Sequence, residues 1–267
     1  MTAKTIVVTG ASDGIGRAAA QRFRDDGHRV AIVGRSPEKT AAVAAELKVD
    51  YFIADFTRLD NVRSLASVLL ERYERIDVLA NNAGGIMGPR ELTVDGHEKT
   101  LQVNHLAPFL LTQLLLVRLE ANAATVIATS SAGNRLFGNI DVNDLENARD
   151  YSATKAYGDA KLANILFTRE LAARTTLRAA AFHPGVIATN FAAESSSAMR
   201  LLYATGLKRL LRSADTGADT LVWLAETDAW PNGGYFSKRS IAQANAQAYD
   251  DSLAKAVWEQ SATMVGL

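Results

Sequence analysis

The strongest constraint on the fold is a regular alternation between short apolar runs and longer stretches with helical patterning. The predicted strands are Thr5–Thr9, Arg29–Gly34, Asp50–Ala54, Asp77–Asn81, Thr125–Ser130 and Arg178–His183. The predicted helices between them are Ile15–Asp26, Ser36–Lys48, Asn61–Tyr73, Asp95–Glu120 and Tyr157–Arg174. Apolar strands of this kind are buried on both faces, as parallel strands are, and strand–helix alternation builds βαβ units. The pattern therefore predicts an α/β fold with one doubly wound parallel sheet and helices on both faces.

A glycine-rich turn joins the first predicted strand to the first helix, with the spacing Gly-x-x-x-Gly-x-Gly. Glycine adopts turn conformations that other residues avoid and lets a backbone approach a pyrophosphate closely, while the new helix offers N–H groups and a positive dipole end. A plain tight turn is the alternative, but the first βα turn is where dinucleotides bind. We expect the cofactor contacts here to come from Gly10, Ser12, Asp13, Gly14, Ile15 and Gly16.

The end of the second strand bears on the choice between NADP and NAD. A site that prefers NAD usually carries an acid about 20 residues after the glycine turn, where it binds the ribose 2′-hydroxyl. Here the strand ends in Gly34-Arg35-Ser36, with no acid. Arg35 offers a bidentate cation for a 2′-phosphate and Ser36 a hydroxyl, with Arg17 close to the turn in sequence. We favour NADP(H); if Arg35 is only a solvated loop charge, NAD(H) is the alternative.

Composition excludes several function classes. The chain has no cysteine, which excludes disulfides, thiolate nucleophiles, cysteine zinc sites and iron–sulfur clusters. Its 29 Lys and Arg residues balance 29 Asp and Glu residues, so a large phosphate-binding surface and a nucleic-acid partner are not expected. His28, His97 and His105 lack the spacing of metal ligands, and we expect no metal.

No segment reads as a membrane span or a targeting signal. The most apolar long stretch, Leu106–Leu119, is interrupted by polar residues and is shorter than the roughly 20 residues that cross a bilayer. We interpret it as a buried core helix and expect no integral membrane segment. Met1–Lys4 leaves no room for a signal peptide before the first strand, so we expect a cytoplasmic protein.

Polar motifs gather around the ends of the later strands. Asn81–Gly84 follows the fourth strand and Ser130–Ser131 ends the fifth, at the carboxyl ends where open α/β sheets bind ligands. Two Tyr-x-x-x-Lys strings come next, Tyr151–Lys155 and Tyr157–Lys161. Residues i and i+4 share a helix face, and an ammonium beside a phenol lowers its pKa from about 10. The phenol then becomes a usable acid near neutral pH.

These motifs together resemble those of the short-chain dehydrogenase/reductase family, from about Ile6 to Thr189. The motifs, in chain order, are Thr9–Gly16, Asn81–Gly84, the serine that ends the fifth strand, Tyr-x-x-x-Lys and His183–Gly185. The chain is similar, more narrowly, to the retinol dehydrogenase-like group of that family. That likeness is carried by Asn104–Thr112, Lys161–Ala172, His183–Val186, Gly233–Ser237 and Trp258.

The resemblance separates the two Tyr/Lys pairs. The family's catalytic lysine is followed directly by its helix, and Lys161 is followed by Leu-Ala-Asn-Ile-Leu-Phe-Thr-Arg-Glu-Leu-Ala. We therefore choose Tyr157 and Lys161, and place Tyr151 in the loop before the helix, although the distance to Pro184 does not decide between the pairs. Of the two adjacent serines the resemblance selects the second, Ser131, and leaves the first with a structural hydrogen bond.

The implied chemistry is reversible hydride transfer between NADP(H) and a carbonyl/alcohol pair. Tyr157 would donate a proton to the carbonyl oxygen, and Ser131 would hydrogen-bond that oxygen. Lys161 would lower the pKa of Tyr157 and bind the nicotinamide ribose. Asn104 would hold a water that leads protons to Lys161, a role compatible with capping a bent helix.

The resemblance also assigns cofactor contacts beyond the glycine turn and Arg35. Asp55 is similar to the family's adenine-contacting acid, and Pro184, Gly185 and Thr189 would shape the nicotinamide pocket. The full set of these expected contacts is Asp55, Phe56, Asn82, Ala83, Gly84, Tyr157, Lys161, Pro184, Gly185, Val186 and Thr189.

We expect residues 1–267 to form one Rossmann-type oxidoreductase domain, with a substrate lid over 187–215 and a helical tail over 241–267. The amphipathic segment Met199–Arg212 fits the lid, and contact with a membrane surface is the alternative. The expected substrate is a small to medium lipophilic alcohol or carbonyl compound. A non-catalytic dinucleotide-sensing module and a sugar-nucleotide-modifying enzyme on the same fold are the rival functions. A homo-oligomer is compatible with the sequence, which leaves the oligomeric state open.

Overall fold

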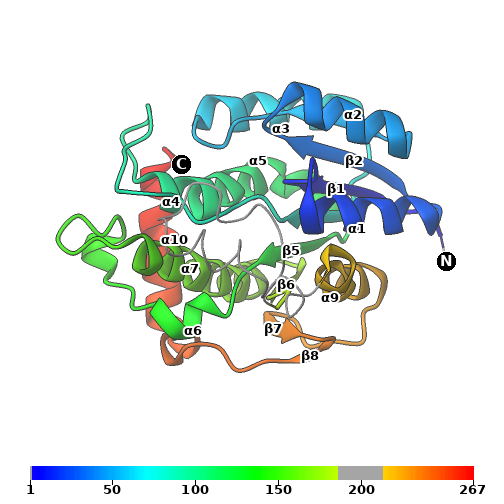
Figure 1. The fold of residues 1–267 in the computed structure, drawn as a ribbon. Helices are drawn as coiled ribbons and strands as arrows, with labels where there is room; N and C mark the ends of the chain where they lie inside the picture. Colours follow the sequence, from blue (N-terminus) through cyan, green and yellow to red (C-terminus); the bar gives the residue numbers. More distant parts are fainter. Residues whose placement is uncertain (1, 186–212) are drawn as a thin grey trace.

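The computed structural model describes residues 2–185 and 213–267. In this part of the chain an eight-stranded sheet runs in the order β3-β2-β1-β4-β5-β6-β7-β8, and all neighbours are parallel except β7 and β8 (Figure 1). The strands are β1 (Thr5–Thr9), β2 (Arg29–Gly34), β3 (Asp50–Ile53), β4 (Val78–Asn81), β5 (Thr125–Thr129), β6 (Arg178–Phe182), β7 (Gly234–Ser237) and β8 (Ser240–Ile241). The α/β fold with a doubly wound sheet is confirmed.

Helices cover both faces of this sheet. The α-helices are α1 (Gly14–Asp25), α2 (Pro37–Leu47), α3 (Leu59–Arg72), α4 (Lys99–Leu101), α5 (Ala107–Ala121), α6 (Gly133–Phe137), α7 (Ala153–Arg174), α9 (Ala214–Glu226) and α10 (Asp251–Met264). A π-helical turn, η1 (Gln102–Leu106), joins α4 to α5, and the 3-10 turns are η2 (Val142–Asp144) and η5 (Ala246–Tyr249).

Two apolar cores sandwich the sheet because successive side chains of a strand point to opposite faces. On β1, Val7 belongs to the core under α3, α5, α7 and α10, whereas Ile6 and Val8 belong to the core under α1, α2 and α9. All three side chains are fully buried, and each contributes about 1.5–3 kcal/mol of hydrophobic free energy. Burial on both faces explains why the strands read as continuous apolar runs.

The prediction of one regular helix over Asp95–Glu120 is wrong in two respects: the helical segment starts later, and a π-helical turn interrupts it. The helical segment begins at Lys99, because the Glu98 carboxylate accepts hydrogen bonds from the amides of Thr100 (2.8 Å) and Leu101 (2.7 Å) and so caps the first turn. The π-helical turn η1 then interrupts the α-helical pattern. Pro108 explains this, since it has no N–H to offer the carbonyl of Asn104 four residues earlier.

Three further features of the secondary structure differ from expectation. Helix α7 begins at Ala153 rather than at Tyr157, because the Ser152 hydroxyl caps it by accepting from the Lys155 amide (3.2 Å). The short helix α6 was not predicted. Ile241 lies in strand β8 rather than in a terminal helix; Lys238 and Arg239 form the hairpin turn with positive φ (50° and 58°) but without the glycine that usually marks it.

The apolar helical segment Lys99–Ala121 has the length and composition to cross a membrane, with mean hydropathy 1.3, but 78% of that window is buried inside the fold. No other described helix meets that test. The interpretation of Leu106–Leu119 as a buried core helix is confirmed.

The expected lid, 187–215, and its amphipathic part, Met199–Arg212, lie outside the described residues except for the last three positions. There Ser213 caps α9, accepting a hydrogen bond from the Thr216 amide (3.2 Å). The division of the chain into one domain with a lid stays a prediction.

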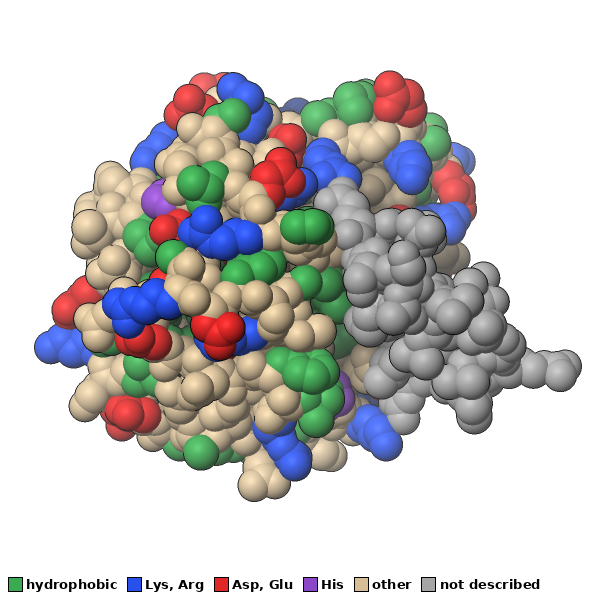
Figure 2. Space-filling model, turned by 60° about the vertical axis from the view of Figure 1, so that its left-hand side comes forward, with side chains coloured by type: hydrophobic (Ala, Val, Ile, Leu, Met, Phe, Trp, Pro, Cys, Tyr) green, Lys and Arg blue, Asp and Glu red, His purple; other side chains and the backbone are tan. Residues whose placement is uncertain are grey.

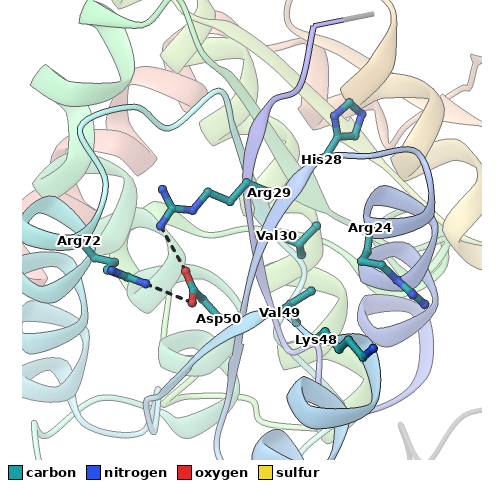
Figure 3. A pocket seen from close by; sticks show the side chains of 8 residues that line it. All are labelled: Arg24, His28, Arg29, Val30, Lys48, Val49, Asp50 and Arg72. Atoms are coloured by element: carbon teal, nitrogen blue, oxygen red, sulfur yellow. Dashed lines mark hydrogen bonds and ion pairs between the residues drawn. The ribbon is translucent and has the colours of Figure 1, made fainter.

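Charges of both signs are interspersed on the surface that Figure 2 shows, as the zero net charge predicts. Cations do gather around a pocket at the amino ends of β2 and β3, the end of the sheet opposite to the predicted ligand site (Figure 3). There Asp50 lies between Arg29 (3.5 Å) and Arg72 (3.4 Å), and Arg24 and Lys48 lie at helix carboxyl ends, where cations complement the dipole. The ion pairs with Asp50 and the helix dipoles therefore explain why cations gather around this pocket.

Candidate active site

The glycine turn packs so tightly against the β4 end that side chains would not fit. A Cβ on Gly10, whose φ is +66°, would lie 2.7 Å from the Cα of Ala83. A Cβ on Gly16 would lie 2.4 Å from the Gly10 carbonyl oxygen and 2.7 Å from the Nδ2 of Asn82. Helix α1 begins at Gly14, where Asp13 accepts a hydrogen bond from the Gly14 amide (2.7 Å). The turn therefore brings a helix N-terminus and the Asn82–Gly84 segment together at the carboxyl edge of the sheet.

Thr9 links the end of β1 to the Asn82–Gly84 segment through hydrogen bonds, a role that the sequence analysis did not assign to it. Its Oγ1 accepts hydrogen bonds from the amides of Asn82 and Ala83, both at 3.0 Å, and donates to the Ala80 carbonyl (3.3 Å). The Asn82 side chain returns a bond from Nδ2 to the Thr9 carbonyl oxygen (3.0 Å). The sequence signal that could have indicated this role is a threonine at the end of an apolar strand, directly before the glycine turn.

Arg35 and Ser36, the residues expected to contact a 2′-phosphate, follow the end of β2. Arg35 is exposed directly after β2. The Ser36 hydroxyl accepts from the Lys39 amide (3.3 Å) as the cap of α2 and donates to the Glu38 carboxylate (3.0 Å). The backbone N–H of Glu38 and, after it, the Ser36 hydroxyl lower the pKa of the Glu38 carboxyl. Ser36 is therefore the N-cap of α2, the role that its position before Pro37 and Glu38 predicts.

Arg17 forms an ion pair with Glu46 on α2. Two hydrogen bonds, 2.6 and 2.8 Å, join its guanidinium to both carboxylate oxygens. Ser12 lies beside the end of β2, since a Cβ on Gly34 would be 3.1 Å from the Cβ of Ser12. That Arg35 contacts a cofactor phosphate stays a prediction.

The turn after β3 contains Asp55 and Phe56. The Asp55 carboxylate accepts from the Thr57 amide (3.0 Å), and its own amide donates to the Asn61 side chain (3.4 Å). Phe56 is buried, and its carbonyl oxygen accepts from the Gln102 amide group (3.2 Å). Asp55 sits at the carboxyl end of its strand, as expected, whereas Phe56 mainly packs.

Asn104 and Lys161 meet at Gly84. A Cβ on Gly84 would lie 2.4 Å from the Oδ1 of Asn104 and 3.0 Å from the Nζ of Lys161. The Asn104 side chain accepts from the Gly85 amide (3.0 Å) and donates to the carbonyls of Gly85 and Thr100, both at 2.9 Å. It therefore holds the turn after β4 against the bent helix, which is the structural role expected beside the catalytic one.

Lys161 is an amine in an almost fully dehydrated position. Its side chain projects from α7, and its Nζ donates to the Thr129 carbonyl (3.0 Å). The same Nζ lies 5.6 Å from the ring centre of Tyr157. Burial lowers the pKa of this lysine to about 7. The residue is only 1% exposed.

Ser131 and Tyr157 meet at Gly133. A Cβ on Gly133 would lie 3.1 Å from the Cε1 of Tyr157 and 3.4 Å from the Oγ of Ser131. That Oγ accepts from the Gly133 amide (3.1 Å). Ser130, in contrast, is buried, and its hydroxyl donates to the Lys161 carbonyl (2.7 Å), so its predicted structural hydrogen bond is confirmed.

Two side chains missed by sequence reasoning hold the Ser131 peptide. The carbonyl oxygen of Ser131 accepts from the Nδ2 of Asn134 (2.5 Å) and from the Tyr235 hydroxyl (3.3 Å). Burial raises the pKa of that tyrosine, so it stays a neutral donor. The Gly-Gly-Tyr-Phe-Ser string contains Tyr235, but nothing in its spacing links it to Ser131.

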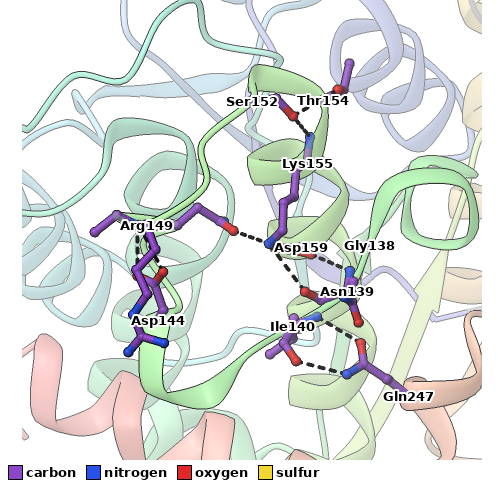
Figure 4. A network of polar contacts seen from close by, with 12 residues as sticks. Gly138, Asn139, Ile140, Asp144, Arg149, Ser152, Thr154, Lys155, Asp159 and Gln247 are labelled. Carbon is purple, nitrogen blue, oxygen red and sulfur yellow. Dashed lines mark hydrogen bonds and ion pairs between the residues drawn. The ribbon is translucent and has the colours of Figure 1, made fainter.

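Tyr151 and Lys155, the Tyr/Lys pair that was not chosen, form hydrogen bonds and ion pairs with residues outside the candidate site. The Tyr151 hydroxyl donates to the carbonyl of Gly88 (3.0 Å) and to the Glu98 carboxylate (3.4 Å). Figure 4 shows Lys155 pointing at Asp159, with 2.7 Å between Nζ and Oδ2, within a network that ties the 138–149 loop to α7. The structure thus gathers Asn104, Ser131, Tyr157 and Lys161 in one place and leaves Lys155 outside it.

The last expected cofactor contacts follow β6. The Gly185 amide donates to the Nδ1 of His183 (3.1 Å), and that imidazole lies 5.8 Å from the Tyr235 ring. Pro184 and Gly185 therefore continue from the strand end on the site's edge, whereas Val186 and Thr189 lie outside the described residues. Across the described part of the chain, no three His, Asp or Glu side chains are grouped so that they could hold a metal ion.

Comparison with known proteins places this geometry in a family. The short chain dehydrogenase family model matches residues 4–200. A Streptomyces sp. (strain C5) protein, DnrU, named as a candidate daunorubicin C-13 ketoreductase, is 42% identical over 98% of this chain and 93% of its own. Human retinol dehydrogenase 13 is 34% identical over 99% of this chain and 85% of its own.

Solved structures agree with those relatives. A crystal structure of a Mycobacterium paratuberculosis protein, 32% identical, superposes with a TM-score of 0.80 and covers 98% of this chain and 93% of its own. A Shigella flexneri short chain dehydrogenase structure complexed with NADP is 26% identical, with a TM-score of 0.67 over 89% of this chain and 97% of its own. The chain is therefore an enzyme of the short-chain dehydrogenase/reductase family and belongs to its retinol dehydrogenase-like group.

Proposed function

We propose that this enzyme transfers a hydride between NADP(H) and a carbonyl/alcohol substrate, with Tyr157 as the proton donor and acceptor. The observation that carries the proposal is the convergence of Asn104, Ser131, Tyr157 and Lys161 around Gly84 and Gly133, at the carboxyl ends of β4 and β5. Ligands bind at this edge in open α/β sheets.

The residues present fit a dinucleotide cofactor. The turn from Gly10 to Gly16 leads into the N-terminus of α1, where backbone N–H groups and the helix dipole favour a pyrophosphate. Ala83 and Gly84 present backbone without bulky side chains beside that turn. When bound, NADP(H) supplies or accepts the hydride, and the protein supplies orientation and charge.

The chain's own groups would manage the proton and the developing negative charge. In the reducing direction the Tyr157 hydroxyl donates its proton to the carbonyl oxygen. Because the Ser131 Oγ accepts from the Gly133 amide, its own hydrogen is left to stabilise the same oxygen. The ammonium of Lys161, 5.6 Å from the Tyr157 ring centre, favours the phenolate that remains. Asn104 would hold the water through which Lys161 exchanges protons.

NADP(H) is preferred over NAD(H) in this proposal because Arg35 follows β2 where an acid would select NAD. The NADP-complexed Shigella structure supports the same choice. The substrate class is a small to medium lipophilic ketone, aldehyde or alcohol, which the ketoreductase and retinol dehydrogenase names of the relatives support.

The proposal is tested by following NADPH and NADH oxidation with a panel of lipophilic aldehydes, ketones and quinones. We expect NADPH-dependent reduction that Tyr157→Phe lowers by at least about 100-fold. Tyr151→Phe is the matched control, since it removes the other tyrosine hydroxyl and is expected to retain turnover. Abolition by Tyr151→Phe with near-normal activity of Tyr157→Phe would reverse the assignment.

The cytoplasmic location, the single-domain organisation and a homo-oligomeric state stay proposals drawn from the sequence. Cell fractionation, limited proteolysis and light scattering, respectively, test them. Recovery of the protein in the membrane fraction would contradict the first.

A further inference from the structure

A buried chain of three polar side chains lies behind the candidate site and is not used by the mechanism above. Asn164 on α7, His105 in the π-helical turn and Ser261 on α10 are 4%, 1% and 0% exposed. The His105 Nδ1 lies 3.1 Å from the Asn164 Oδ1, and its Nε2 lies 2.8 Å from the Ser261 Oγ. Buried polar groups cost free energy unless they are satisfied, so a chain of this kind calls for an explanation.

Asn164 links the two backbone segments that carry the candidate site. Its Nδ2 donates to the carbonyl of Asn104 (3.0 Å) and to the carbonyl of Thr129 (3.2 Å). The Thr129 carbonyl is also the acceptor for the Nζ of Lys161 (3.0 Å). One amide group therefore holds the oxygen that positions Lys161.

Pro108 explains why the Asn104 carbonyl takes a side-chain donor. In an α-helix this carbonyl would accept from the amide of the residue four positions later, which is Pro108 and has no N–H. The bend that sets Asn104 beside Gly84 thus leaves an acceptor to be satisfied, and Asn164 supplies the donor from the neighbouring helix.

The same bonds fix the tautomer of His105. The two carbonyls only accept, so Asn164 must present Nδ2 to them and Oδ1 to His105. Because Oδ1 also only accepts, the proton of the imidazole must be on Nδ1. Nε2 is then an acceptor for the single hydrogen of the Ser261 hydroxyl, for which it competes with the Val257 carbonyl, 2.7 Å from the same Oγ. Burial lowers the pKa of His105 to about 4, so the ring carries a single proton at neutral pH.

We propose that Asn164 is a positioning residue of the hydride-transfer site, oriented by the Nδ1-protonated ring of His105 and, through it, by Ser261 of the C-terminal helix. The proposal rests on the proposed function of Lys161. It assigns to α10 a direct link to the catalytic edge of the sheet, from Ser261 through His105 and Asn164 to the Thr129 carbonyl.

The kinetic test compares Asn164→Leu with Thr168→Val. Thr168 is an equally buried polar residue one turn later on α7, and its hydroxyl donates only within the helix, to the Asn164 carbonyl (2.8 Å). We expect Asn164→Leu to lower kcat per NADPH-binding site by about 10- to 100-fold, the effect of small misplacement of a reacting group. The NADPH Kd should change by less than about threefold, and Thr168→Val should leave kcat unchanged.

A loss that is only structural would lower the number of NADPH-binding sites but not kcat per site. Unchanged kcat per site in Asn164→Leu would overturn the positioning role. If the wild-type enzyme and Tyr157→Phe both lacked hydride transfer, the proposed function would fail instead, so the two failures are distinguishable.

The second test needs no folded variant of Asn164, and its first readout does not depend on activity. Nitrogen-15 NMR of the imidazole rings of the wild-type enzyme, with His105→Gln to identify the signal, reports which nitrogen is protonated. We expect the Nδ1–H tautomer for His105 and a change at its Nε2 in Ser261→Ala, together with a loss of about two- to tenfold in kcat. An Nε2–H tautomer would refute the orientation assigned to Asn164.

Discussion

Replacing Lys161 by Met is expected to abolish carbonyl reduction and, below about pH 7, to stabilise the apoenzyme. The site keeps an amine at a position that is 1% exposed, and burial lowers its pKa from 10.5 to about 7. Met fills a similar volume without a charge to dehydrate. The buried Lys161 ammonium therefore lowers the free energy of unfolding, while the proposed reaction requires it.

The size of that cost follows from the pKa. A change of one pKa unit corresponds to about 1.4 kcal/mol, so the buried ammonium costs roughly 5 kcal/mol of folding free energy at pH values where it is charged. Its hydrogen bond to the Thr129 carbonyl, worth about 1.5–3 kcal/mol, offsets part of this. The Lys161→Met protein should then be about 2 to 3.5 kcal/mol more stable than the wild type at pH 6.

The pH dependence has a definite sign. Between about pH 7 and 10.5 the unfolded chain binds the Lys161 proton and the folded chain does not, so wild-type stability rises with pH through that window. The advantage of Lys161→Met should shrink by roughly 2 kcal/mol between pH 7 and 9.

Urea unfolding of both apoproteins at pH 6, 7, 8 and 9, followed by tryptophan fluorescence, measures this difference. Titrating groups that do not interact with Lys161 cancel in it. A Lys161→Met protein that is less stable than the wild type at pH 6, or a difference that is independent of pH, would refute the reasoning.

Three other substitutions test separate parts of the site. Gly84→Ala should lower kcat by at least about tenfold without unfolding the protein, because its Cβ would lie 2.4 Å from the Asn104 Oδ1; circular dichroism and steady-state rates measure this. Arg35→Ser should raise the KM for NADPH by about tenfold or more and leave that for NADH unchanged, whereas Arg17→Gln, whose guanidinium contacts Glu46, should change neither. Lys155→Met should lower the free energy of unfolding by about 1–3 kcal/mol, since the largely buried Asp159 carboxylate loses its ion pair, yet it should retain turnover; a loss of activity without a loss of stability would contradict this.

The strands and the glycine turn could be predicted because their physics is local. A strand buried on both faces, such as β1, must be apolar throughout, and the close approach of Gly10 to Ala83 excludes any side chain. The candidate site followed from the same logic, since parallel strands bring their carboxyl ends to one edge.

The rest depended on how elements pack. Lys155 and Lys161 both lie on α7, and at 3.6 residues per turn they point roughly 120° apart, so only the packing of α7 on the sheet decides which of the two lysines faces the site. The π-helical turn keeps the apolar pattern of an α-helix, and Pro108 was its one visible sign. Ser261 meets His105 only through the docking of α10, which no spacing along the chain encodes.

The most direct test of the hydride-transfer assignment is to follow the label from NADPH deuterated at nicotinamide C4. Wild-type enzyme, incubated with a lipophilic ketone that it reduces, should yield an alcohol that carries deuterium on the carbinol carbon, as mass spectrometry would detect. Tyr157→Phe should bind NADPH with a similar Kd and form this product at least about 100-fold more slowly. Label transfer at the wild-type rate by Tyr157→Phe, or no transfer by the wild type across the whole panel of aldehydes, ketones and quinones, would contradict the account.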